Sequence, residues 1–508
     1  MLNLLMLRQT YLVRKVQSGQ HNRLGELFTV QREIVAWYKQ DCEKVKLQAR
    51  AEELDTSESV RIYHHELHRN KIKRTSILKL DTGDTILNGH KQCTQFLENS
   101  VSELLLHHSN LSEAAQNELL AEVPIVFTEV DNALLTRTPE KEEVKNSVWT
   151  SNLHAAPGTD GLTSFLYYSC WDILGDSLTD VVEAIHAGSP PSCSKRTSMM
   201  VFGTKPKKPR SVKVSDKRRL SLLNSDFKVV TGLDNNRFKK VSTHTLSHSQ
   251  LAAGDDRRIH HGINKARDAI LAAANSREGM GILDNDYKAA FHFMVLLWVL
   301  KVLKAKGLAQ KVIDRLTNIY SNNLTIVVVN NILGKVIPNN YWSIRQGDRP
   351  SSALFCYGID PHIIWLENRL QGITIHRQPA LGPVLPGVQT LPEVKEVYKV
   401  IGYIDDIKPA ITSMDEFRLV DLGSSLFEAA SGCILHRDPL SGKVKFLPLG
   451  RWKGILQQDD LPVRNIVLSE HLDMVCLHTL TLARLIVTHS WTKCPISLVH
   501  GKEVNLCL

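Results

Sequence analysis

The spacing of apolar and polar positions divides the chain into a helical beginning and a mixed continuation. Residues 20–75 are densely charged and nearly free of glycine and proline, which predicts one or two long helices. A glycine flanked by two aspartates then lies between β-rich runs at 76–89, a pattern typical of a hairpin. Amphipathic spacing predicts two further helices, at 111–122 and 128–147, with Thr128 as the N-cap of the second.

From Val148 onward, short β-branched runs alternate with helical segments. The runs IVVVNN and KVIGYI predict strands, and apolar spacing at 291–306 predicts a helix. After about residue 412 the pattern becomes mainly helical again, interrupted by a passage rich in glycine and proline at 432–454. The sequence therefore predicts an α+β fold class.

The positive charge of the chain is concentrated in one segment. The chain has 62 Lys and Arg and 53 Asp and Glu, a net charge of +9. Residues 205–258 contain 14 of the basic and five of the acidic residues, so the remainder carries 48 of each sign. A basic segment indicates an anionic partner such as nucleic acid, although a solvated basic face gives the same composition. The residues of this segment that we expect to bind nucleic acid are Lys207, Lys208, Arg210, Arg257 and Arg258.

Cysteine usage and hydropathy bear on where the protein works. The nine cysteines are scattered without a CxxC pair, which argues against a disulfide framework or a zinc ribbon and favours a reducing compartment, the cytosol or the nucleus. The longest apolar run, 293–300, is far shorter than the roughly 20 residues that span a bilayer. The opening MLNLLMLRQ lacks the layout of a signal peptide, so we expect no membrane partner.

Two adjacent carboxylates, Asp405 and Asp406, lie between apolar runs in VIGYIDDIKPAI. A hairpin here places both acids at a turn, with Ile404 interpreted as an apolar strand residue. Adjacent like charges repel, so a buried pair needs a cation, and Mg²⁺ prefers carboxylates together with phosphate oxygens. A solvated Asp-Asp turn is the alternative interpretation.

A second acidic stretch favours the metal site. In GMGILDNDYKAAFHF, Asp284 and Asp286 follow a short apolar strand and precede a helix. Acids from two strands can hold two metal ions that clamp an attacking hydroxyl and a triphosphate in line.

Several stretches resemble the motifs of reverse transcriptases from LINE-type (non-LTR) retrotransposons, in the family's order. The two acidic stretches resemble motifs A and C. The other matching stretches are AAPGTDG (155–161), KRRLSLLNSDFKVVTGLDNNRF (217–238), QLAAGDDRRIHHGINKARDAI (250–270), SIRQGDRPSSALFCYGIDP (343–361), LFEAASGCILHRDP…KVKFL (426–447, with an insertion) and HLDMV (471–475). The resemblance covers about 148–476.

The resemblance implies three metal ligands. Asp405 and Asp406 match the family's metal-binding pair. The family places an aromatic residue five positions after the motif A aspartate, and counting back from Phe291 selects Asp286. Asp284 is then an accessory or solvated acid. The three ligands would hold two Mg²⁺ (or Mn²⁺) ions.

It also implies contacts with the incoming nucleotide. Arg219 matches an arginine that contacts the triphosphate, with Lys205 or Lys207 as its lysine partner. Gln346 and Gly347 match residues that line the nucleotide pocket.

Two further positions have alternative interpretations. Phe291 matches an aromatic residue that excludes a 2′-hydroxyl, although it also suits the apolar face of a helix. Lys445, or else Lys443, matches a lysine proposed to protonate the leaving pyrophosphate, although a solvated lysine fits there equally well.

The family's fold is a right-hand polymerase. The implied organisation is a helical N-terminal extension at 1–147, fingers and palm at 148–412, and a motif D region with a partial thumb at 413–508. The implied activity is RNA-directed DNA synthesis from deoxynucleoside triphosphates, with an RNA template and a DNA primer. The alternative is a catalytically decayed remnant that still binds RNA or DNA.

The sequence departs from the family pattern in several places. His292 stands where the family usually has aspartate, and Leu220 stands where it has proline. Beyond Cys476 the sequence no longer resembles the family's thumb, and neither an endonuclease nor a CCHC knuckle is expected.

Overall fold

The computed structural model describes residues 2–18, 23, 25–34, 36, 76–106, 111–153, 155–205, 208, 211–274, 276–288, 290–339, 343–377, 394–438, 442–473 and 484–486. The chain forms two units, Met1–Ser76 and Ile77–Leu508. The first unit contains α1 (Leu2–Gln17) and a helical stretch at 25–34, whose contact is made by Leu12, Leu27, Val30 and Ile34. The helices predicted at 20–75 lie mostly outside the described residues.

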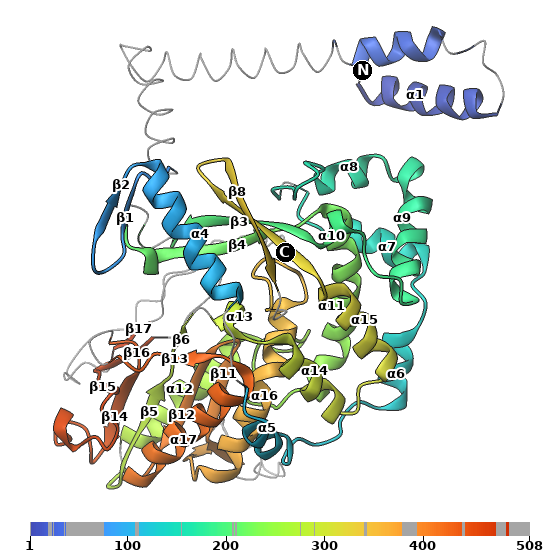
Figure 1. Cartoon of the computed structure of the whole chain (residues 1–508). Helices are drawn as coiled ribbons and strands as arrows, with labels where there is room; N and C mark the ends of the chain where they lie inside the picture. The colour runs from blue at the N-terminus through green and yellow to red at the C-terminus, as the bar shows by residue number, and fades with distance from the viewer. Residues whose placement is uncertain are drawn as a thin grey trace, which may run out of the picture. The chain divides into compact units, whose positions relative to one another are not determined.

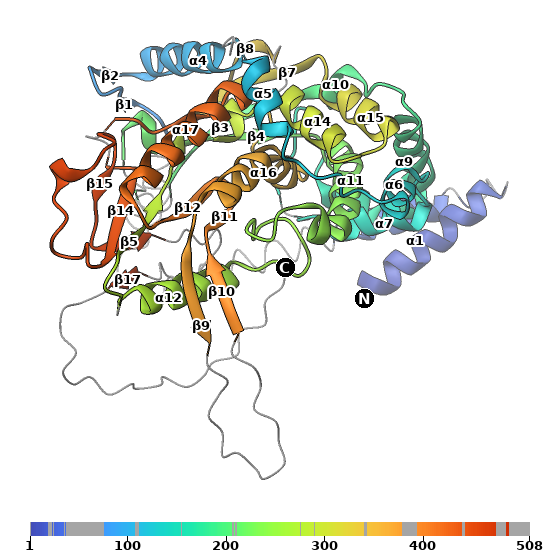
Figure 2. The same ribbon diagram turned by 90° about the horizontal axis from the view of Figure 1, so that it is seen from below.

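The second unit is built on a five-stranded sheet (Figure 1). Its strands, in spatial order, are β11 (Val400–Tyr403), β12 (Asp406–Ile411), β5 (Gly279–Asp284), β14 (Lys445–Gly450) and β15 (Val467–Leu468). The central strand β5 is apolar and buried on both faces, as expected for a strand covered by helices on each side. Met280 and Ile282 pack on α12 (Ile259–Ala274), whereas Leu283 faces the main core that includes α16 (Ser351–Arg369) and α17 (Met414–Ser431). Figure 2 shows the sheet between these two layers.

A four-stranded sheet lies beside it. Its order is β4 (Lys217–Leu222), β3 (Thr197–Thr204), β7 (Asn323–Val329) and β8 (Ile332–Asn339). Strands β3 and β7 are parallel, and the other neighbours are antiparallel. The helix α4 (His90–Leu106) covers one face of this sheet with Cys93, Leu97 and Val101.

The remaining elements surround the two sheets. The short strand pairs are β1 (Lys79–Asp81) with β2 (Ile86–Asn88), β6 (Tyr287–Lys288) with β13 (Ile434–Leu435), β9 (Ile373–Arg377) with β10 (Val394–Tyr398), and β16 (His471–Asp473) with β17 (Arg484–Ile486). The other helices are α5 (Glu113–Leu120), α6 (Glu129–Thr136), α7 (Lys141–Trp149), α8 (Ser164–Ser169), α9 (Trp171–His186), α10 (Cys193–Arg196), α11 (Ser225–Thr245), α13 (Ala290–Phe293), α14 (Leu296–Ala305) and α15 (Gln310–Tyr320), with 3₁₀ turns at Val214–Asp216 and Gln458–Asp460.

The mixed composition of helices and sheets confirms the predicted α+β class. The hairpin predicted at 76–89 is also confirmed, because β1 and β2 pair antiparallel around Gly83, whose φ is +100°. Thr128 caps α6 as predicted, in a reciprocal capping box with Asp131.

Three predicted elements are wrong in their extent. The single helix predicted at 128–147 is two helices, because the chain leaves helical geometry at Arg137 and becomes helical again at Lys141. Pro139 lies between them, and proline disfavours helical geometry in the residue before it, Thr138. The helix predicted at 291–306 is likewise interrupted, between α13 and α14. After residue 412 the described residues form one α-helix, α17, and then strands β13 to β17. The mainly helical structure predicted for this segment is therefore wrong. Apolar residues there pair with β5 and β6 instead of forming helices.

The main core is continuous across the second unit. It contains residues from both sides of the predicted domain boundaries at 147 and 412, such as Val144, Leu223 and Phe446. Within the part of the chain that the structure describes, no helix is long and apolar enough to cross a membrane.

Candidate active site

A cavity of about 560 Å³ lies where the two larger sheets approach each other. Most of the residues that the sequence predicts to bind metal or nucleotide line it. These are Asp286, Asp405, Asp406, Lys205, Arg219, Phe291, Gln346 and Lys445. Gly347 follows directly after Gln346 and has φ +119°, a conformation that favours glycine. A Cβ there would lie 2.5 Å from the carbonyl oxygen of Ser221, so this position also requires a residue without a side chain.

Asp405 belongs to the turn between β11 and β12. The antiparallel register pairs Tyr403 with Asp406, which leaves Ile404 and Asp405 as the turn residues. The interpretation of Ile404 as a strand residue is therefore wrong: its φ is +58°, an uncommon conformation for a β-branched side chain. The turn is held this way by contacts with another segment, described below.

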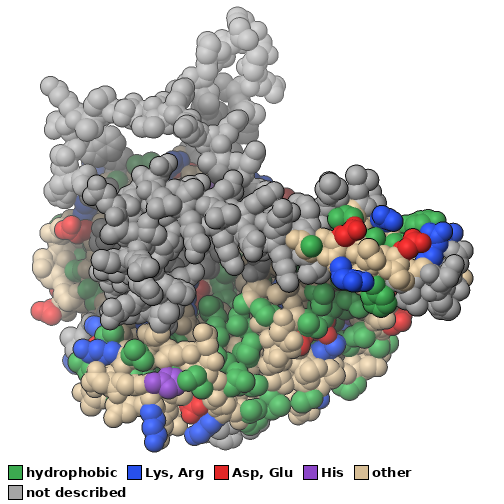
Figure 3. Space-filling model, turned by 90° about the horizontal axis from the view of Figure 1, so that it is seen from above, with side chains coloured by type: hydrophobic (Ala, Val, Ile, Leu, Met, Phe, Trp, Pro, Cys, Tyr) green, Lys and Arg blue, Asp and Glu red, His purple; other side chains and the backbone are tan. Residues whose placement is uncertain are grey.

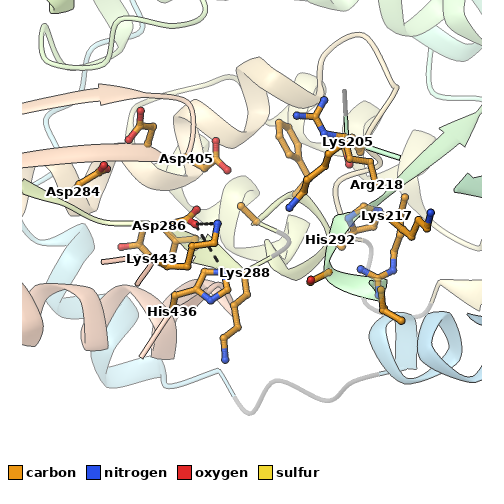
Figure 4. A pocket seen from close by; sticks show the side chains of 18 of the residues that line it. Lys205, Lys217, Arg218, Asp284, Asp286, Lys288, His292, Asp405, His436 and Lys443 are labelled. Atoms are coloured by element: carbon orange, nitrogen blue, oxygen red, sulfur yellow. Dashed lines mark hydrogen bonds and ion pairs between the residues drawn. The ribbon is translucent and has the colours of Figure 1, made fainter. Parts of the chain in front are cut away.

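Asp284 and Asp286 leave β5 beside this turn. An isolated antiparallel bridge joins Asn285 to Ile407, which places Asp284 opposite Lys408 on the neighbouring strand. Asp286 forms an ion pair with Lys443 at 2.9 Å, and its carboxylate lies 4.0 Å from His436 (Figure 4).

Lys408 joins two of the acids inside the protein. Its Nζ lies 2.6 Å from Oδ1 of Asp284 and 2.6 Å from Oδ1 of Asp406, and its side chain is 2% exposed. Burial opposes the charged ammonium, but the two carboxylates outweigh burial and raise the pKa of Lys408. Burial raises the pKa of Asp284 to about 7 in spite of this cation. Lys408 was not predicted from the sequence as part of the site. The residues around a lysine in an apolar strand do not indicate that it will pair with an acid on another strand.

Asp405 lacks such a partner. It forms no ion pair with a described residue, and burial raises its pKa to about 7, with further increases from the charges of Asp406 and Asp286. A buried carboxylate in this state is a hard oxygen donor that a divalent cation would stabilise. Asp405 and Asp286 therefore fit a metal ion chemically.

The described side chains alone do not complete a metal site. Among the side chains that the structure describes, no group of three or more His, Cys, Asp or Glu is placed to hold a metal ion. A cation beside Asp405 would need additional oxygens from water or phosphate, which is common for Mg²⁺.

Lys205, Lys217 and Arg218 lie across the cavity from Asp286 and Asp405, whereas Lys288 and Lys443 lie on the same side as these acids (Figure 4). Burial lowers the pKa values of Lys205 and Arg219. Arg219 donates a hydrogen bond to Ser100 at 3.1 Å, and its buried Nε has no partner among the described residues. Burial, followed by the charge of Arg219, lowers the pKa of His292 to about 3, so this imidazole is neutral.

Phe291 and the candidate motif D lysines also face the cavity. The ring of Phe291 packs against Phe355 with centroids 5.1 Å apart, and Phe291 also lines the cavity. Lys445 lies opposite Asp284 in the backbone register of β14 and β5, whereas Lys443 forms the ion pair with Asp286.

The five residues predicted to bind nucleic acid have different environments. Lys207 and Arg210 lie outside the described residues. Lys208 is paired with Asp216 at 3.1 Å but stays largely exposed. Arg258 is exposed, whereas the guanidinium of Arg257 donates hydrogen bonds to four backbone carbonyl groups. Figure 3 shows basic, acidic and hydrophobic side chains intermixed on one face of the described protein.

Comparison with known proteins gives one distant relationship. No protein-family model matches the chain. Over 334 residues the chain is 24% identical to the "Transposon TX1 uncharacterized 149 kDa protein" of Xenopus laevis. The match covers 64% of this chain and 23% of that protein. The chain is distantly similar to a transposon protein.

The raised pKa of Asp405 predicts a pH-dependent stability. Its ordinary pKa is 3.8 and its folded value is about 7, so the folded protein holds a proton that the unfolded chain releases between these values. Stability therefore falls as pH rises through this window. We expect the melting temperature without divalent cations to fall less steeply between about pH 5 and about pH 7 in Asp405→Asn than in the wild type. Asp314→Asn, at an exposed position on α15, should keep the wild-type slope. Equal slopes for Asp405→Asn and the wild type would contradict the prediction.

The Lys408 ion pairs predict a large loss of stability on substitution. Lys408→Met leaves the buried Asp284 and the half-buried Asp406 without their cation, which should cost roughly 3–5 kcal/mol in the free energy of unfolding. Lys443→Met removes an exposed lysine from Asp286 and should cost about 1 kcal/mol or less. Chemical denaturation of both variants measures the difference, and similar losses would show that the Lys408 pairs do not stabilise the sheet.

Proposed function

We propose that this protein is an RNA-directed DNA polymerase that adds deoxynucleotides to a primer. The observation that carries the proposal is the cavity, which Asp286, Asp405 and Asp406 line together with Lys205 and Arg219. Figure 4 shows Lys205 across the cavity from Asp286 and Asp405. These residues come from separate stretches of the chain between positions 205 and 406. The resemblance to reverse transcriptase motifs predicted that they would lie together. The similarity to a transposon protein supports an origin in a mobile element.

The acidic side suits the primer end and the metal ions. Two bound Mg²⁺ or Mn²⁺ ions would supply charge for the triphosphate and a lowered pKa for the primer 3′-hydroxyl. Asp405 and Asp286 are the residues that would hold them. Asp406 could add its Oδ2, because its Oδ1 is engaged by Lys408.

The basic side suits the triphosphate. The guanidinium of Arg219 has no carboxylate partner among the described residues. It can therefore donate hydrogen bonds to phosphate oxygens without breaking an ion pair. Lys205 lines the same cavity and provides a second positive charge. Lys443 or Lys445 would stand near the leaving pyrophosphate, and either ammonium could donate a proton to it.

The remaining lining residues suit the sugar and the base. The exposed part of the Phe291 ring offers no hydrogen bond to a 2′-hydroxyl, so a deoxyribose is favoured there. Gln346 and Gly347 would lie along the nucleotide, as the matching motif implies. In this proposal the template is RNA, the primer is DNA, and residues 148–412 are the fingers and palm of a right-hand polymerase.

A second candidate function is favoured by the two lysines. Lys408 and Lys443 neutralise three acids of the cavity, and such pairing also suits a catalytically decayed protein that binds RNA or DNA without extending a primer. Primer extension separates the two candidates, because both predict nucleic-acid binding but only one predicts synthesis.

The metal assignment predicts which acids are essential. Asp405→Asn and Asp286→Asn should each lower primer extension on an RNA template by about 100-fold or more, because an amide does not hold a cation against phosphate. Asp284→Asn should retain much more activity, since Asp284 is held by Lys408. Extension at the wild-type rate by Asp405→Asn protein would refute the polymerase site, and binding without extension by the wild type would favour the decayed protein.

The position of Phe291 predicts the choice of sugar. Phe291→Val should raise the use of ribonucleotides relative to deoxyribonucleotides by about 100-fold, because it opens space beneath the sugar and removes an apolar surface. Phe355→Val is the matched control, since Phe355 is fully buried behind Phe291 and does not line the cavity. It should lower the melting temperature without changing the preference. If Phe291→Val only lowers stability, Phe291 is a core residue and the selection of Asp286 by its spacing is lost.

A further inference from the structure

The turn that carries Asp405 is held in its uncommon conformation by the side chain of Gln250. The amide of Gln250 contacts both backbone polar groups of Ile404. Its Oε1 accepts a hydrogen bond from the Ile404 N–H at 3.1 Å, and its Nε2 donates one to the Ile404 carbonyl at 3.3 Å. Oε1 also accepts from the N–H of Ala252 at 3.1 Å. Gln250 is completely buried, so water does not compete for these bonds.

The segment that contains Gln250 is attached to the neighbouring strand. Its backbone pairs with β11 through two hydrogen bonds of 2.8 Å, from Leu251 N to Gly402 O and from Gly402 N to Ser249 O. The backbone of 249–251 therefore fixes the position of the Gln250 side chain relative to the turn.

Arg257 stabilises the same segment from its other side. Its guanidinium donates to the carbonyl oxygens of Thr243 at 2.7 Å and Leu246 at 2.9 Å, and also to those of Ser247 and Gln250. These four acceptors lie along the chain between α11 and the turn contact. A single planar cation thus closes the loop 243–250 around itself.

We propose that Gln250 and Arg257 are positioning residues that set the conformation of the Ile404–Asp405 turn. This inference rests on the proposed function for its catalytic consequence, because Asp405 is the acid that the turn presents to the cavity. Ile404 adopts a strained φ, and such strain persists only where the surroundings fix it. Gln250 supplies that restraint directly, and Arg257 supplies it through the loop.

The geometry separates this role from contact with a template. The Gln250 amide has no exposed surface, and the Arg257 guanidinium is already surrounded by carbonyl oxygens. The next residue, Arg258, is exposed. Its side chain forms no hydrogen bond or ion pair with the described residues of the loop 243–250. Two adjacent arginines therefore have different roles, one internal and one available to phosphate.

The first test uses Gln250→Leu in the full chain. Hydrogen exchange of the peptide around 400–406 should become faster, because the Ile404 N–H loses its acceptor. In primer extension, kcat should fall by about 100-fold with little change in KM for the nucleotide, since the carboxylate is displaced while the basic side is intact. Gln116→Leu is the matched control: Gln116 is also buried and hydrogen-bonded, to the Ala430 carbonyl and to Lys301, and both of these partners lie outside the segment 400–406. It should lower the melting temperature without changing either readout.

A rescue experiment distinguishes positioning from a general loss of structure. Glycine adopts positive φ without strain, so adding Ile404→Gly to Gln250→Leu should restore part of kcat. If Gln250→Leu does not fold, Gln250→Glu keeps an acceptor for the Ile404 N–H and tests the loss of the Nε2 donor alone. Exchange at 400–406 that equals the wild type in whichever variant folds would overturn the proposal, as would a failure of the rescue.

The two arginines give the decisive comparison. Arg257→Met should accelerate exchange at 400–406 and leave the salt dependence of RNA binding unchanged, whereas Arg258→Met should flatten that salt dependence and leave exchange unchanged. The reverse pattern would overturn the proposal. Because exchange is measured without substrate, accelerated exchange in an inactive protein would support the positioning role and refute only the polymerase function.

Discussion

The central sheet depends on how the charges of Asp284 and Asp406 are compensated where β5 and β12 pair. Two carboxylates that approach each other away from water repel, and burial makes each of them costly. The register that joins Asn285 to Ile407 places the Lys408 ammonium between them, 2.6 Å from each. A shift of the register by one residue would turn Lys408 away from Asp284 and leave that acid unpaired, whereas Asp406, two residues before Lys408 on the same strand, would move with it. The ion pairs thus specify the pairing that also brings Asp405 beside Asp286.

Local chemistry made part of this site predictable from the sequence. Adjacent aspartates between apolar runs indicated a hairpin with both acids at its turn. The register pairs Tyr403 with Asp406, so Asp405 is in the turn and Asp406 is the first residue of β12. Asp286 was chosen over Asp284 by its distance from Phe291, and all three residues line the cavity. Lys408, Gln250 and the conformation of Ile404 were not predictable, because each depends on a partner distant in sequence. The segment after residue 412 was misinterpreted for the same reason: its apolar residues form strands only because β5 is present to pair with them.

The basic segment shows how composition overstates a binding surface. Residues 205–258 hold the whole excess of positive charge, yet several of these cations serve the fold. Lys217 donates to Thr204 and to the Ser211 carbonyl, and Arg237 is buried in an ion pair with Glu143. Arg257 closes its own loop. The charge available to a polyanion is therefore smaller than the count suggests, and it is presented by residues such as Arg258 and by the cavity itself.

Asp405 and Arg219 both line the cavity, and neither has an oppositely charged partner among the described residues. Asp405 has no cation among the described residues, and its raised pKa records the cost of that state. Arg219 has no carboxylate there, and the residue beside Phe291 that could have supplied one is the neutral His292. An aspartate at position 292 would place a carboxylate near the Arg219 guanidinium, whereas the neutral imidazole leaves that guanidinium available. A metal ion would therefore stabilise Asp405, and phosphate oxygens would stabilise Arg219. A metal-bound triphosphate carries both groups. A ligand that combines both charges in one molecule would satisfy the two residues together, which a metal ion or an anion alone would not.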